Sequence, residues 1–191
     1  MKARENMSKS AVIAITALLI TSCLLPGMIP LKSGSASPMP AMEKNIDTVI
    51  QVLTGKDWYR LEALAKEQYS TEDFAKPGVL TFTVENPNDK PVYFSYGWCA
   101  KDEGILKQNL GHIGAKLYFN DEQLGNDVVH NLSSKLNDGQ VCSELGVLLS
   151  EWTAGEYKLK AVASFDAKIN DGFADYEAGD YIYEYDVTVK Q

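Results

Sequence analysis

The sequence has only two histidines, His112 and His130, and it lacks the short motifs that build common hydrolase sites. A GxSxG nucleophile elbow, an HExxH zinc motif and a GxxxxGK[ST] phosphate loop are all absent. A Ser–His pair would need one of the two histidines, with Ser133 and Ser134 as the hydroxyls nearest to His130. The sequence indicates no third ligand for a metal shared by the histidines. We therefore expect no enzymatic activity and no cofactor, with a hydrolase of unrecognised site as the enzymatic alternative.

Positive charge is also scarce. The chain has 18 Lys and Arg residues against 26 Asp and Glu residues, a formal net charge of −8. Without residues 1–22, which hold three basic and one acidic side chain, 15 basic and 25 acidic residues leave −10. Such a charge repels nucleic acid, so we expect no nucleic-acid partner. The share of apolar residues, 45%, is that of an ordinary globular domain.

The one long uncharged run, residues 11–31, follows Lys2, Arg4 and Lys9. A basic stretch followed by an apolar stretch is typical of a secretory signal. With 21 uncharged positions, the run could also stay uncleaved as a membrane-spanning helix. A third alternative is ordinary cleavage after Ala36. In each case residues from about 38 onward are predicted to lie outside the cytoplasmic membrane.

Within this run, Ile20-Thr21-Ser22-Cys23 resembles the lipobox of exported bacterial lipoproteins. The resemblance implies that residues 1–22 are removed and that Cys23 carries a diacylglyceryl group. Two or more acyl chains hold a protein stably on a bilayer. Residues 23–42 end in "KSGSASPMPAM", whose small, polar and proline residues predict a flexible tether. The expected location is the extracytoplasmic face of the cell membrane.

If Cys23 is lipidated, Cys99 and Cys142 are the two cysteines left. In an oxidising compartment such a pair is expected to form a disulfide. The bond would close a loop of about 44 residues, for which the chain-entropy model gives roughly 4 kcal/mol. Neither cysteine lies in a CxxC motif, so a redox-active pair is the less favoured alternative.

Residues 43–69 are predicted to be helical. Apolar residues recur there at intervals of three and four, and Gly55 stands where a C-capping glycine belongs. Asp57 could cap a second helix. The residues that carry the two patterns are Ile46, Val49, Ile50 and Leu53, then Leu61, Leu64, Ala65 and Gln68.

Residues 70–191 change to a period of two, which predicts about seven short strands. The clearest are "EYKLKAVASF" and "YIYEYDVTV", each with one apolar and one polar face. One-sided sheets must bury their apolar faces against each other. The expected fold class is therefore mainly β, an antiparallel two-sheet sandwich preceded by one or two short helices.

The stretch "EWTAGEYKLKAVASF" resembles the corner before a late strand of bacterial immunoglobulin-like domains. In its organisation the segment is similar to exported bacterial proteins built as such sandwiches, which implies an immunoglobulin-like fold. Antibody domains place the core tryptophan away from both cysteines, whereas Trp98 here adjoins Cys99 and would face the opposite side of the strand. An antibody-type core is therefore not expected.

The acidic stretch "FDAKINDGFADYEAGDY" offers Asp171, Asp175 and Asp180 as calcium ligands. The EF-hand pattern is absent, because Ala167 and Ile169 occupy the first and third ligand positions. Turns between two strands explain the stretch better, so no metal site is expected.

Two rows of aromatic residues could form a platform for a glycan or a peptide. Alternation of the second row with Glu184 and Asp186 favours burial instead. The rows are Tyr93, Tyr96 and Trp98, then Tyr181, Tyr183 and Tyr185.

Together these features predict a membrane-anchored, extracytoplasmic, non-enzymatic binding or envelope-associated protein. Its candidate ligands are an extracellular protein, a peptide or a glycan. The stretch "VENPNDKPVYFSYGW" is similar to the strand–turn–strand of some immunoglobulin-like proteinase inhibitors, which makes inhibition the main alternative.

Overall fold

The computed structural model describes residues 38–55 and 57–190. The signal-like run, the lipobox and Cys23 lie outside the described residues, as does most of the predicted tether. Among the residues described, no helix is both long enough and apolar enough to cross a membrane.

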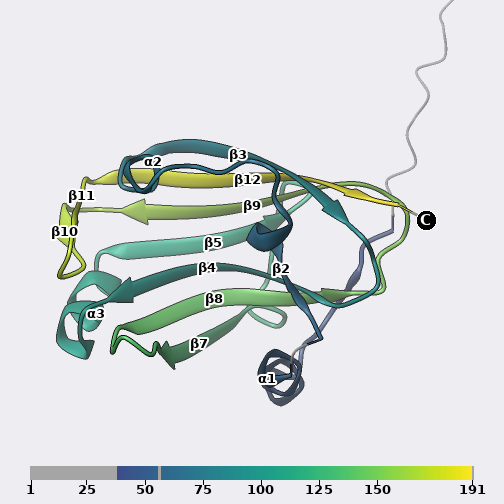
Figure 1. The fold of residues 1–191 in the computed structure, drawn as a ribbon, viewed down its shortest axis with the longest axis horizontal. Coiled ribbons are helices and arrows are strands. Elements are labelled where there is room, and N and C mark those ends of the chain that lie inside the picture. Colours follow the sequence, from purple (N-terminus) through teal and green to yellow (C-terminus); the bar gives the residue numbers. More distant parts are fainter. Residues whose placement is uncertain (1–37, 56, 191) are drawn as a thin grey trace, which may run out of the picture. The chain divides into compact units, whose positions relative to one another are not determined.

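Two β-sheets pack face to face (Figure 1). The first contains β1 (Ala41–Met42), β2 (Tyr59–Arg60), β4 (Val92–Ala100), β7 (His130–Lys135) and β8 (Val141–Ser150), in the order β1-β8-β4-β2 with β7 also beside β8. The second contains β3 (Gly78–Asn86), β5 (Ile113–Phe119), β6 (Glu122–Gln123), β9 (Gly155–Phe165) and β12 (Gly179–Val189), in the order β3-β12-β9-β5-β6. A small hairpin joins β10 (Ile169–Asn170) to β11 (Asp175–Tyr176).

The alternating residues of the long strands form the core, as the period of two predicts. On β9, Tyr157, Leu159 and Ala161 are buried, while Glu156 and Lys158 are exposed. They pack against the inner face of β4 and beside the inward-facing residues of β12, in one continuous hydrophobic cluster. The prediction of a mainly β, two-sheet sandwich with a few short helices is confirmed.

Not every strand pair is antiparallel, however. β12 runs parallel to β3 over nine residue pairs, and β2 runs parallel to β4. After β9 the chain returns through the β10–β11 hairpin and lies antiparallel to β9 as β12. The other side of β12 is filled by β3, a strand from much earlier in the chain, so no tight turn fixes the relative direction.

The first predicted helix is present as α1 (Ile46–Thr54), and the N–H of Gly55 donates to the carbonyl oxygens of Gln51 and Val52. The second predicted helix, over residues 57–68, is wrong. That stretch forms β2 and a 3-10 helix, η1 (Leu61–Leu64). Pairing of residues 59 and 60 with the open edge of β4 overrides the local helical preference.

Two further short helices follow, α2 (Thr71–Phe74) and α3 (Glu103–Leu110). The first lies beside β3, and the second lies at the end of the sandwich near the β10–β11 hairpin (Figure 1).

The predicted disulfide between Cys99 and Cys142 is confirmed, and it lies within one sheet. The two cysteines are directly opposite each other on β4 and β8, with their Cα atoms 4.0 Å apart. Trp98 points the other way, into the core with Phe165 and Tyr181. The disulfide therefore fastens two neighbouring strands rather than joining the two sheets, unlike the antibody arrangement.

Candidate functional site

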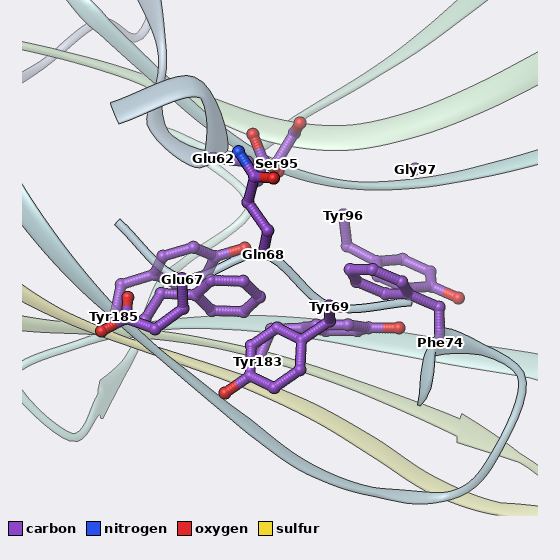
Figure 2. Close-up of a pocket in the computed structure, with 11 residues that line it drawn as sticks. Glu62, Glu67, Gln68, Tyr69, Phe74, Ser95, Tyr96, Gly97, Tyr183 and Tyr185 are labelled. Atoms are coloured by element: carbon purple, nitrogen blue, oxygen red, sulfur yellow. The ribbon is translucent and has the colours of Figure 1, made fainter. Parts of the chain in front are cut away.

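A cavity of about 460 Å³ opens along one side of the sandwich (Figure 2). Among the described residues, β3 is the outermost strand of its sheet, and only the two residues of β2 pair with the free side of β4. The cavity is bounded by these two strands, by β12 and by the chain segment that follows β2. Its lining residues are Glu62, Glu67, Gln68, Tyr69, Phe74, Phe82, Ser95, Tyr96, Gly97, Tyr183 and Tyr185.

The segment after η1 replaces a missing neighbour strand along β3. The N–H of Lys66 donates to the carbonyl oxygen of Thr83 at 3.0 Å. The Tyr69 hydroxyl donates to the Thr81 carbonyl oxygen at 2.8 Å and accepts from the Thr81 N–H at 3.2 Å. The Glu67 carboxylate accepts from the Thr83 N–H, and this bond lowers the pKa of Glu67. These bonds satisfy the exposed strand edge and fix one wall of the cavity.

Aromatic rings make up most of that wall and of the floor. The Phe74 and Tyr183 rings are stacked with centroids 6.1 Å apart, and the Tyr69 ring lies edge-on to Phe82 at 5.1 Å. Tyr96 lies 6.1 Å from Tyr183. A capping box between Ser70 and Asp73 starts α2 and so brings Phe74 to the rim.

The two predicted aromatic rows divide between packing and this cavity. Tyr181 and Trp98 are buried in one core cluster, and Tyr93 is buried beneath α1. Tyr96, Tyr183 and Tyr185 line the cavity from the inner faces of β4 and β12. Burial raises the pKa of Tyr183 from its ordinary value of 10.0 to about 12, so its hydroxyl stays neutral even where an exposed tyrosine ionises.

The polar end of the cavity is built around Glu62 of η1. One of its carboxylate oxygens, Oε2, is buried and has no hydrogen-bond partner among the described residues. The nearby Arg60 guanidinium donates instead to both carboxylate oxygens of Glu144, at 3.3 and 3.1 Å, and to Ser95 Oγ at 3.1 Å. Figure 2 shows Glu62 and Ser95 on a different side of the cavity from the Phe74 and Tyr96 rings.

Burial is the main reason why the pKa of Glu62 is raised above its ordinary value of 4.5. A carboxyl whose pKa is higher in the folded state stabilises the fold below its ordinary pKa, and that stabilisation is lost as the pH rises through the raised pKa. At neutral pH this stabilisation is reduced, because burial disfavours the ionised form of the carboxyl.

We expect Glu62→Gln to increase the free energy of unfolding at pH 7 by about 1 kcal/mol, because the amide is neutral. The gain should disappear near pH 4, where the wild-type carboxyl is protonated as well. Urea denaturation of both proteins at the two pH values measures the difference. A variant less stable than wild type at pH 7 would show that Glu62 has a structural role.

The histidines are held by other groups. His112 Nδ1 is 2.8 Å from the Asp166 carboxylate, and His130 Nε2 is 3.1 Å from the carbonyl oxygen of Glu43. Neither forms a hydrogen bond to a serine hydroxyl in the part of the chain that the structure describes. Ser133 and Ser134 lie on β7.

Each of the three calcium candidates forms hydrogen bonds with different groups of the protein. Asp171 accepts hydrogen bonds from two backbone N–H groups of the β10–β11 turn and from the Tyr176 hydroxyl. Asp175 accepts from the Asn170 side chain at 2.7 Å, and Asp180 accepts from Ser164 at 2.6 Å. Within residues 38–55 and 57–190, no three His, Cys, Asp or Glu side chains converge as a metal site.

Sequence reasoning missed the cavity because its walls come from distant segments. Only one local signal was available, the Ser70-x-x-Asp73 spacing that precedes Phe74. The predicted second helix also gave Glu62 no role, since in that pattern it falls between the apolar positions.

No family model matches the sequence, and a search of curated proteins gives no match. Among solved structures, a cysteine protease inhibitor from Entamoeba histolytica is similar at 10% sequence identity. The similarity covers 60% of this chain and 96% of that chain, with a TM-score of 0.28. A TM-score this low carries no argument about function.

Proposed function

We propose that the protein is a non-enzymatic binding module held on the extracytoplasmic face of a membrane, and that the cavity beside Glu62 is its ligand site. One observation carries the binding role: a concave wall of aromatic rings faces a buried carboxylate oxygen that has no hydrogen-bond partner within residues 38–55 and 57–190. Ligand sites commonly combine a largely apolar surface with a few such polar groups.

The proposed location rests on separate features. The basic and apolar order of the first residues supports export, and the likeness to a lipobox supports lipidation of Cys23. A disulfide between Cys99 and Cys142 is the kind of bond that persists in an oxidising compartment. The residues between Cys23 and β1 would then act as the tether between membrane and sandwich.

Phe74 offers a direct test of the ligand site because its side chain is 38% exposed at the rim and contributes little to the core. Saturation-transfer NMR with N-acetyl amides of lysine, phenylalanine and glutamate, methyl glucoside and choline should detect binding of at least one probe. We expect Phe74→Ala to weaken that binding about fivefold, the loss of one aromatic contact.

Phe173 provides the matched control, since it is an exposed phenylalanine, 64% accessible, on the β10–β11 turn. Phe173→Ala should leave binding unchanged. Absence of binding by every probe, or equal binding by both variants, would contradict the proposed site. Inhibition of papain or trypsin that survives in Phe74→Ala would instead assign the function to another surface, as the inhibitor alternative requires.

A further inference from the structure

We infer that the cavity selects ligands with a positively charged organic ammonium group, held between the Glu62 carboxylate and the tyrosine rings. This inference depends on the proposed function, because it names the ligand class of that same cavity.

The first argument is the carboxylate oxygen of Glu62 that has no hydrogen-bond partner in the described part of the chain. Glu62 Oε2 has no partner among the described residues, and the lining of the cavity includes no lysine, arginine or histidine. Arg60 is close, but its guanidinium is bonded to Glu144 and Ser95. Glu67, the other acid of the cavity, is bonded to the Thr83 backbone. A ligand cation beside this carboxylate would supply the opposite charge, and an ammonium group with N–H bonds would also supply a hydrogen-bond donor.

The second argument is the aromatic surface. Tyr69, Tyr96, Tyr183 and Tyr185 line the same cavity, together with Phe74 and Phe82. The faces of such rings carry negative electrostatic potential and attract ammonium groups. The Tyr183 hydroxyl is neutral at pH 7, as an ordinary tyrosine is, and burial raises its pKa further to about 12, so this ring acts through its face and its O–H.

The other ligand classes fit less well. An anion would meet both the Glu62 carboxylate and the net charge of −8 of the whole chain. A neutral sugar could stack on the rings, yet it would leave the carboxylate without an opposite charge. Only a cation matches the acidic end and the aromatic end together.

A pair of nearly isosteric probes isolates the charge. Choline carries a trimethylammonium group, whereas 3,3-dimethylbutan-1-ol has a neutral tert-butyl group of the same shape. By titration calorimetry at pH 7 we expect choline to bind the wild-type protein at least tenfold more tightly than the alcohol. Glu62→Gln should weaken choline binding at least fivefold and leave the alcohol unchanged.

Glu122→Gln is the control, because it removes an acid from the exposed strand β6, outside the cavity lining. It should retain the preference for choline. The circular dichroism of Glu62→Gln verifies that any loss of binding is not a loss of fold.

The pH dependence gives a second readout. Choline affinity should fall as the pH is lowered through the raised pKa of Glu62, and Glu62→Gln should remove this dependence. The charged and titratable groups that act on Glu62 or lie near it are Arg60 of β2, Glu144 of β8, Tyr93 of β4 and Tyr185 of β12. Burial raises the pKa of both Tyr93 and Tyr185, so neither tyrosine ionises in this range.

The outcomes separate the two proposals. Equal affinity for choline and the alcohol, or choline binding that Glu62→Gln does not weaken, overturns the ammonium inference. If methyl glucoside or N-acetyl phenylalanine amide binds while choline does not, the ligand class is wrong and the binding site stands. If none of the probes binds, the proposed function fails and the inference fails with it.

Discussion

Gly146→Ala is expected to lower the free energy of unfolding by about 3 kcal/mol, at the upper end of the cost of overpacking a core. A Cβ atom at Gly146 on β8 would overlap the phenol ring of Tyr93 on β4. The two strands are neighbours, and the tyrosine ring lies across the glycine on the outer face of the sheet. A glycine is therefore required here for close approach.

The Tyr93 ring cannot move aside at low cost. It is completely buried and packs with Val49 of α1 and Leu148 of β8. The Trp58 ring lies edge-on to the Tyr93 ring, with centroids 6.0 Å apart. The guanidinium of Arg60, on β2, lies 5.6 Å from the centroid of the Tyr93 ring. Interiors packed this closely accommodate an extra methyl group only by shifting several elements together.

Gly114→Ala is the matched control. Gly114 is also a strand glycine, but the nearest atom to an added Cβ is the Ser164 carbonyl oxygen at 4.0 Å. We expect its effect to stay within about 0.5 kcal/mol. Urea denaturation followed by tryptophan fluorescence compares the two variants.

A second substitution tests the cause. If the Tyr93 ring is responsible, Tyr93→Leu combined with Gly146→Ala should cost less than the sum of the two single changes. Equal stability of Gly146→Ala and Gly114→Ala, or strict additivity in the double variant, would contradict the proposed clash.

This outer-face packing also supports the candidate site. Arg60 joins the Tyr93 ring to Glu144 and Ser95, and Ser95 lines the cavity. Glu62 lies only two residues beyond Arg60, at the start of η1. α1 and Tyr93 therefore hold β2 in place, and β2 in turn fixes the position of the Glu62 carboxylate.

The strands could be predicted because their signal is local. The alternation of Tyr157, Leu159 and Ala161 with charged residues depends only on which face of one strand is buried. The disulfide could be predicted for a different reason: assigning Cys23 to a lipid left one possible pair. Both predictions needed no knowledge of which strands are neighbours.

The remaining features depend on contacts between distant residues. Residues 57–68 have a helical pattern, but β4 offers an open edge that residues 59 and 60 satisfy. The parallel pairing of β3 with β12 also joins segments about one hundred residues apart. The cavity combines Glu62, Tyr96 and Tyr183, so it could not be read from any single window of the sequence.

Replacement of both Cys99 and Cys142 by alanine is expected to lower the free energy of unfolding by about 3 kcal/mol. The bond spans a sequence separation of 43, and this loop contains α3, β5, β6 and β7. Without the disulfide, the unfolded chain can adopt more conformations. This gain in entropy favours the unfolded state and lowers the free energy of unfolding.

Reduction of the wild-type protein supplies the control for this change, because it opens the same loop without changing a residue. Wild-type protein in dithiothreitol should unfold at the urea midpoint of the double variant, well below that of the oxidised protein. Coincident midpoints for oxidised and reduced wild type would refute the stabilising role of the bond.

The position of the disulfide adds a local consequence. The bond fastens β4 to β8 at residue pair 99–142, whereas near pair 93–148 Tyr93 of β4 packs against Leu148 of β8. The cavity residues Ser95, Tyr96 and Gly97 lie between these two attachments. We therefore expect amide hydrogen exchange at residues 96–99 to accelerate in the double variant more than at β9, where no attachment has been lost.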